Sequence, residues 1–339
     1  MASVVELVLF VCWLVSVPFY TVFLYTIAKY RKEEPFNSPF FTLCLSLGFF
    51  DMLTLVNNWV LLKFPMLDWL YTRDLLRLAP KQLATLLVSV SWFTAYGQIL
   101  GIPLMTFNRL SAIVFPHSDA LWWSPERTHI YIAANFLIAA GIAMPLPFLE
   151  FDCTGLGIHP NDTGPFTIRW LNFDWQEVYF GGTLYCLISL SLACLVCYVA
   201  IFWKVRSHLK QVGPSLANTN KKNKKKKNNN SSLANSDIKL AFFGFVLVVL
   251  LSVWSYYVYA MSYADNLDSY VWLVVLYSVL LDVVSWCNPY LLLLTSSAVR
   301  NHVGMVVGCK ADANAVVQVV PLNSRSRKDR STKTTDVKL

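Results

Sequence analysis

Seven long, uninterrupted apolar segments constrain this chain more than any other feature of its sequence. A helix needs about 20 apolar residues to cross the ~30 Å hydrocarbon core of a bilayer. Lipid offers backbone groups no hydrogen-bond partner, so each segment must be helical, and the lack of polar–apolar alternation argues against a β-barrel. Charged residues make up only 14% of the chain, against about 25% in soluble domains, which also indicates a membrane protein.

The predicted spans are residues 7–28, 40–62, 83–107, 130–149, 178–203, 240–260 and 270–295. They predict an all-α membrane protein whose residues 1–300 form a seven-transmembrane helix bundle. Loops rich in Lys and Arg stay on the cytoplasmic side of a membrane. With the N-terminus outside, the inner segments hold 23 of the 28 Lys and Arg residues and the outer segments hold five. The sequence therefore predicts an outer N-terminus and a cytoplasmic C-terminus.

Three cytoplasmic segments are expected to differ in structure. Residues 213–237 are rich in Lys and Asn and poor in apolar residues, so like-charge repulsion predicts a disordered loop. Its partner is either the anionic lipid of the inner leaflet or water alone, and a solvated linker is slightly favoured. Residues 296–310 place valines at helical spacing beside Arg300, which predicts an amphipathic helix on the membrane surface. The basic tail 311–339 is predicted to be disordered.

Two residues are candidates for covalent modification. Asn161 begins an Asn-Asp-Thr sequon in a predicted outer loop, on the side where glycosylation occurs, although such triplets also arise by chance. Cys309 lies at the end of the predicted amphipathic helix and is a candidate for palmitoylation, with a free cytosolic thiol as the alternative. Cys153 is the one cysteine in the predicted outer loops, which contain no second cysteine to pair with it.

Two acids lie inside predicted spans: Asp51 in the second and Asp282 in the seventh. Each costs about 2.5–3.5 kcal/mol to insert at the centre of a membrane helix. No Lys, Arg or His lies within any predicted span, so both acids are expected to lack a neutralising cation. The two acids therefore either belong to a functional site or, as the less favoured alternative, fix the packing of the helices through hydrogen bonds.

Two further segments are candidates for a functional role, one at the inner end of the third span and one within the seventh span. Arg109 lies at the inner end of the third span, where it either enters a groove between helices or simply reaches the interface. The seventh span contains Asn288, Pro289 and Tyr290, and a proline there is expected to kink the helix. We expect Asp51, Asp282 and this segment to form one polar core that couples the outer half of the bundle to Arg109.

Together these features resemble the rhodopsin-like seven-helix receptors. That family has an aspartate in the second helix, which Asp51 matches. It has Asp-Arg-Tyr at the inner end of the third helix, then five residues, then proline; here residues 108–110 read Asn-Arg-Leu and precede Pro116 at the same spacing. Its Asn-Pro-x-x-Tyr in the seventh helix is matched by Asn288 and Pro289, with leucine in place of the tyrosine.

The departures from that pattern are similar to those of the nematode serpentine chemoreceptors. Asn108 replaces the acid that pairs with the arginine, and the start of the third helix has no cysteine to bridge to Cys153. The fifth and sixth helices contain no proline. Residues 108–117 and 288–294 are most similar to the gamma and v classes, and the resemblance covers residues 7–300.

The resemblance implies a chemosensory G-protein-coupled receptor of the plasma membrane or of a sensory cilium. A small-molecule or peptide ligand would bind in the outer half of the bundle. The inner ends of the fifth and sixth helices would then move away from the third, and a heterotrimeric G protein would engage Arg109, with Asn108 and Pro116 in the same coupling site. No cofactor, metal site or nucleic-acid partner is expected, since no ligand spacing or binding motif is present.

Two other classes of function compete with a receptor. A proton-coupled secondary transporter would use Asp51 and Asp282 as a relay, but the spans show no inverted repeat. A membrane enzyme would need a reactive constellation near one face, and the sequence contains none. The joint spacing of the motifs favours the receptor.

Overall fold

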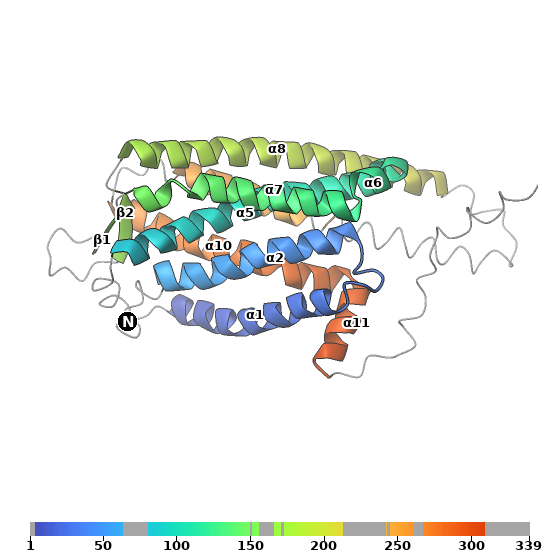
Figure 1. The fold of residues 1–339 in the computed structure, drawn as a ribbon, viewed down its shortest axis with the longest axis horizontal. Coiled ribbons are helices and arrows are strands. Elements are labelled where there is room, and N and C mark those ends of the chain that lie inside the picture. Colours follow the sequence, from blue (N-terminus) through green and yellow to red (C-terminus); the bar gives the residue numbers. More distant parts are fainter. Residues whose placement is uncertain are drawn as a thin grey trace, which may run out of the picture.

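The computed structural model describes residues 4–63, 81–149, 151–155, 166–170, 173–212, 242, 245–260 and 267–308. Its long helices lie side by side along one direction (Figure 1). They are α1 (Val4–Lys29), α2 (Pro39–Asn58), α5 (Lys81–Val114), α7 (Pro125–Ala143), α8 (Phe173–Val212), the helix Phe245–Ala260 and α10 (Leu267–Thr295). Each covers most of one predicted span, so the predicted seven-helix membrane fold is confirmed.

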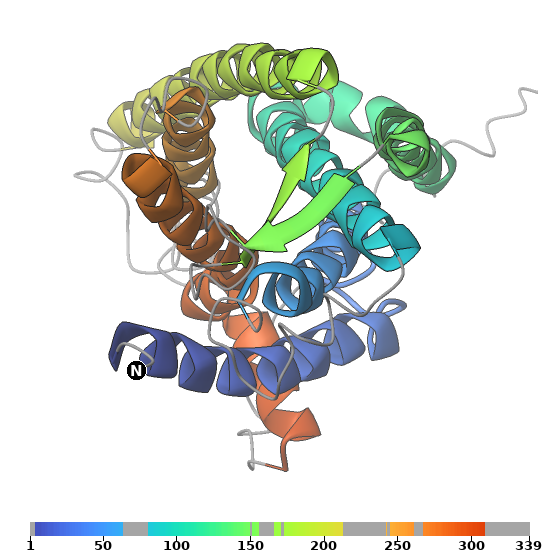
Figure 2. The same ribbon diagram turned by 90° about the vertical axis from the view of Figure 1, so that its left-hand side faces the viewer.

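Shorter elements close the two ends of the bundle. They are the π-helix η1 (Trp59–Lys63), α6 (Pro116–Trp122), the 3-10 helix η3 (Leu146–Phe148), β1 (Phe151–Gly155), β2 (Phe166–Trp170) and α11 (Ser297–Val306). The strands pair antiparallel, with Phe151 opposite Trp170, and lie across one end of the ring of helices (Figure 2). We call this the hairpin end, and the opposite end, with α6 and α11, the α11 end. The hairpin was not predicted, because its strands are short and lie in a loop.

Helix ends follow local sequence. Pro39 and Pro125 occupy the first turns of α2 and α7, where proline costs no hydrogen bond, and the Ser124 hydroxyl accepts the Arg127 N–H. α5 continues through residues 108–114 and ends before Pro116, which disfavours helical backbone in the residue before it. The segment 108–129, predicted as a connecting loop, is therefore mostly helical. α8 likewise extends beyond its predicted span at both ends.

The helix pair α10 and α11 meets at a bend of 104°. The Arg300 guanidinium donates to the carbonyl oxygens of Leu293 and Leu294, at 2.6 and 3.0 Å, and so caps the last turn of α10. Val299 and Val303 are buried on the inner face of α11. Pro289 lies inside α10, which runs as one continuous helix to Thr295, so the sharp change of direction comes after Thr295.

The outer faces of the helices are apolar and exposed. Largely exposed side chains include Val15, Leu137, Leu192, Val196 and Val199, on α1, α7 and α8. Contiguous apolar surface of this kind is rare on proteins in water and marks contact with another apolar phase. Five helices among the described residues are long and apolar enough to cross a membrane, and a sixth span is formed if α10 and α11 count as one bent pair.

Candidate functional site

The interface between α2 and α5 runs nearly the full length of the bundle. The two helices are antiparallel, so residue numbers rise along α2 as they fall along α5. Successive contacts join Asn57 to Ser91, Asp51 to Gln98, Leu47 to Gly101, Cys44 to Met105 and Phe40 to Arg109. The regular spacing shows that the two helices keep one register from the half of the bundle next to the hairpin end to the α11 end. We call this row of contacts the α2–α5 seam; it connects Asp51 on α2 to Arg109 on α5.

Asp51 is completely buried and accepts hydrogen bonds from three helices. The Tyr20 hydroxyl and the Asn288 amide each donate to Oδ2 at 2.5 Å, and the Gln98 amide donates to Oδ1 at 2.7 Å. Gln98 also donates to the Ser285 hydroxyl at 3.0 Å. Three donors can stabilise a buried carboxylate without a cation. We call these residues the Asp51 network; it ties α1, α2, α5 and α10 together.

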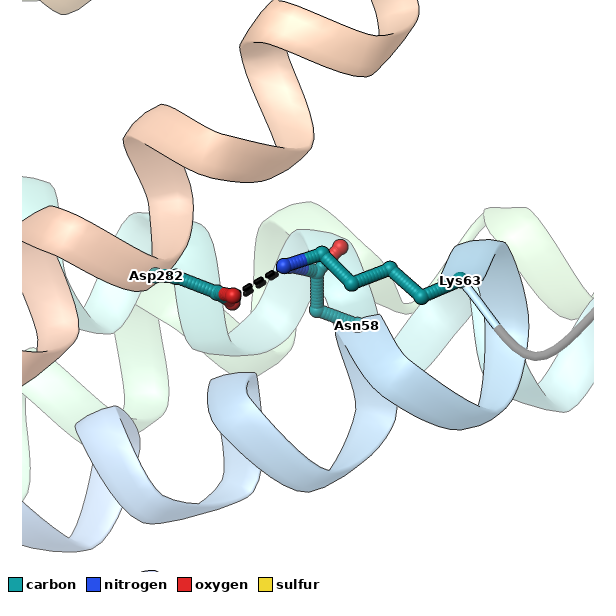
Figure 3. A network of polar contacts seen from close by, with 3 residues as sticks. All are labelled: Asn58, Lys63 and Asp282. Atoms are coloured by element: carbon teal, nitrogen blue, oxygen red, sulfur yellow. Dashed lines mark hydrogen bonds and ion pairs between the residues drawn. The ribbon is translucent and has the colours of Figure 1, made fainter. Parts of the chain in front are cut away.

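Asp282 belongs to a second network, nearer the hairpin end (Figure 3). Its carboxylate forms an ion pair with Lys63 and accepts a hydrogen bond from the Asn58 amide at 2.8 Å. The Asp282 side chain is 0% exposed and the Lys63 side chain 7%. The prediction that Asp282 lacks a cation is therefore wrong. The prediction of one polar core is also wrong for the contacts that the structure describes, because Asp51 and Asp282 have different hydrogen-bond partners there.

The π-helical turn explains how Lys63 reaches Asp282. With 3.6 residues per turn, an α-helix would place Asn58 and Lys63 on different faces. A π-helix pairs residue i with i+5, and η1 therefore brings these two residues onto one face. The Lys63 ammonium also lies 4.6 Å from the centroid of the Trp59 ring, which is fully buried. The ring and the carboxylate together replace the water that the ammonium loses.

Arg109 lies near the end of α5, in partial contact with solvent. Its guanidinium carbon is 3.5 Å from the centroid of the Phe40 ring. Asn108 is buried, and Pro116 is exposed as the first residue of α6. The predicted coupling residues thus lie together at the α11 end. Among the contacts identified between described residues, none joins Pro116 to Arg109.

A short polar network holds α6 against α5. The Ser111 hydroxyl donates to Asp119 Oδ1 at 2.7 Å and accepts from the Trp123 indole at 2.7 Å. Trp123 is itself buried against Phe107 and Tyr131, on α5 and α7. The connection between α5 and α7 is therefore a fixed helical corner beside Arg109.

A small cavity lies in the hairpin half, between α5, α8, α10 and the helix Phe245–Ala260. Its volume is about 40 Å³, which is room for about three waters at roughly 10–15 Å³ each. The side chains around it carry no charge and are mainly aromatic: Trp92, Tyr96, Phe180, Thr183, Trp254 and Tyr277. The hydroxyls of Tyr96 and Thr183 lie 2.9 Å apart and form a hydrogen bond. The cavity is thus an uncharged, mainly aromatic site whose lining residues also carry hydroxyl groups.

Comparison with known proteins identifies the family. Residues 9–309 match the family described as serpentine type 7TM GPCR chemoreceptor Srv. The chain belongs to this serpentine chemoreceptor family. The Serpentine receptor class V-1 of Caenorhabditis elegans is 23% identical over 202 residues, which are 58% of this chain and 62% of that protein. The chain thus spans less than two thirds of the length of this relative. The resemblance to nematode serpentine receptors is confirmed, within the v class.

The remaining predicted residues lie away from the Asp51 network or outside the described residues. The Tyr290 hydroxyl is 3.0 Å from Ser16 Oγ, and its ring stacks on Phe19, so Tyr290 faces α1 and not the polar core. Pro289 is buried within α10. Asn161, Cys309, the loop 213–237 and the tail 311–339 lie outside the described residues. Of Cys153 only the backbone is described, in β1 opposite Ile168.

Several residues that contact Asp51, Arg109 or Asp282 were not among those that the sequence predicted. Gln98 and Ser285 are polar side chains within apolar spans, and this polarity is the signal by which the sequence marks them. Tyr20 and Phe40 are ordinary membrane-helix residues, and nothing in the sequence distinguishes them. Lys63 directly follows the predicted span 40–62, so hydropathy alone places it in the next loop.

Proposed function

We propose that this chain is a chemosensory receptor that binds an external chemical cue in the aromatic cavity and activates a heterotrimeric G protein at the α11 end. The plasma membrane is its expected location, with the hairpin end outside. One observation carries the proposal: α5 lines the cavity with Trp92 and Tyr96 and carries Arg109 at its other end. At 1.5 Å per residue, Tyr96 and Arg109 are separated by about 20 Å along the helix.

The walls of the cavity favour a small, neutral ligand. A charged ligand would lose its water without meeting an opposite charge, which is costly in an apolar site. Aromatic side chains such as Trp92 and Trp254 suit a flat apolar group, and the hydroxyls among the lining residues offer hydrogen bonds. A ligand larger than a few heavy atoms would require these side chains to move.

Replacing Arg109 with alanine is expected to abolish G-protein activation while leaving the receptor at the cell surface. The measurement is a ligand screen in cells, with G-protein dissociation as the readout, for the wild type and Arg109→Ala side by side. Arg31→Ala removes an exposed arginine at the turn before α2 and is the matched control. Normal signalling by Arg109→Ala would remove this residue from the coupling role.

Filling the cavity is expected to prevent the response to any neutral compound found in that screen. Ala95 lines the cavity, and Ala95→Phe would occupy most of its small volume. Ala133→Phe, on an exposed position of α7, adds the same side chain away from the cavity. We expect at least a tenfold loss of apparent affinity in Ala95→Phe alone, about 1.4 kcal/mol. An unchanged dose response at matched surface levels would place the ligand elsewhere.

A further inference from the structure

We propose that Phe40 holds Arg109 in the inactive receptor, through the stacking of the guanidinium on its ring. The inference rests on the proposed function, and it assigns a positioning role to a residue that no sequence motif marks. The Arg109 guanidinium carbon lies 3.5 Å above the centre of the Phe40 ring, which is the separation of direct face-to-face contact. Asn108, the neighbour of Arg109 in sequence, has no charge to offer it.

Phe40 is fixed in place by its surroundings. It lies in the first turn of α2, directly after Pro39 at the start of the helix, and is only 3% exposed. The adjacent Phe41 ring packs against it edge to face at 5.3 Å, and Phe41 in turn contacts Phe36. A buried ring with packed neighbours has little freedom to follow the arginine. Movement of Arg109 away from α2 therefore breaks the contact.

The register between α2 and α5 places Arg109 opposite the Phe40 ring. One turn further into the bundle, Cys44 Sγ lies 3.6 Å from Met105 Sδ, each four residues from the contact at Phe40 and Arg109. The stacking thus continues the regular seam between the two helices. A turn of the last residues of α5 would separate the guanidinium from the ring without disturbing the contacts near Asp51, which lie three turns further along α5.

While it is stacked on Phe40, Arg109 is less available to a G protein at the α11 end. One face of the guanidinium is covered by Phe40, and its Nε atom has no contact with solvent. The next residues of α5, Leu110 and Ile113, pack against the cluster of Tyr198 and Val248 on α8 and the helix Phe245–Ala260. Loosening of that packing would let the last turn of α5 rotate together with α6, to which Ser111 binds it, and Arg109 would then leave the ring for the G protein.

The test compares ligand-independent G-protein activation by variants at equal surface levels. Phe40→Leu removes the ring and keeps an apolar side chain; we expect its basal activation to exceed that of the wild type by about 2- to 30-fold, the range that corresponds to a cation–π contact. Phe41→Leu removes the neighbouring ring from the same helix turn and is expected to show no such rise. Phe40→Tyr retains a ring, so its basal activation is expected to stay at the wild-type level.

A second measurement does not depend on signalling. In a double-mutant cycle on thermal unfolding, Phe40→Leu and Arg109→Met are expected to be non-additive, whereas Phe41→Leu and Arg109→Met should add. An additive Phe40–Arg109 cycle, equal basal rises in Phe40→Leu and Phe41→Leu, or an unchanged Phe40→Leu would each overturn the inference. A wild type that activates no G protein while the cycle shows coupling would instead contradict the proposed function and leave the contact established.

Discussion

Replacing Lys63 with methionine is expected to lower the free energy of unfolding by about 3–5 kcal/mol, because it leaves a buried carboxylate without its cation. Asp282 is fully buried, and a neutral donor such as the Asn58 amide would remain beside it in place of the cation. Methionine keeps most of the length of the lysine stem, so lost packing contributes little. Thermal unfolding of the purified receptor and the fraction of receptor at the cell surface measure the effect.

Two controls separate charge from size in this prediction. Lys204→Met removes an exposed lysine from α8 and is expected to change stability by less than about 0.5 kcal/mol. The double variant Lys63→Met with Asp282→Leu removes both charges, and replacing a buried ion pair by apolar residues is often neutral. We therefore expect the double variant to be more stable than Lys63→Met alone. A double variant as unstable as the single one would show that packing, and not the ion pair, holds η1 to α10.

The Lys63–Asp282 pair also shows where sequence reasoning ends. Hydropathy correctly predicts the span that contains Asp51, since 20 apolar residues have few alternatives to a membrane helix. It cannot predict that α2 continues as a π-helical turn, because that depends on packing against α1 and α10. The long, flexible stem of Lys63 then carries its charge back into the bundle. Its position after the span therefore predicts an exposed loop for Lys63, whereas its side chain is buried beside Asp282.

The same reasoning applies to the contacts of Asp51 and Arg109. The predicted spans and motif spacing placed Asp51 and Arg109 on the correct helices, α2 and α5. Their partners depend on the register between helices, which a single sequence does not contain. Tyr20 and Phe40 are two of many aromatic residues in apolar spans, and only the three-dimensional arrangement shows that they contact a charge. Rules of composition and spacing therefore predict a fold and candidate residues, but not a network.

The second large effect is expected at Asp51, where leucine would leave three buried donors without an acceptor. An unsatisfied buried donor costs about 1–3 kcal/mol, so Asp51→Leu is expected to lower the free energy of unfolding by roughly 3 kcal/mol or more. Tyr20→Phe removes only one donor, and the carboxylate keeps Gln98 and Asn288, so its cost should be about 1 kcal/mol. Thermal unfolding of both variants, with the exposed Asp174→Leu as control, measures this asymmetry.

Asp51→Asn tests signalling where Asp51→Leu does not reach the cell surface. Asparagine keeps an acceptor for one or two of the donors and has nearly the same shape, so the receptor should still fold. The Asp51 network joins α5, which carries Arg109, to α1, α2 and α10. If it transmits the bound state from the cavity, weakening it should reduce ligand-driven activation about 5- to 150-fold, the usual range of coupling between two sites. Asp51→Asn receptors that bind ligand and activate the G protein as the wild type does would show that the network serves only to hold the helices together.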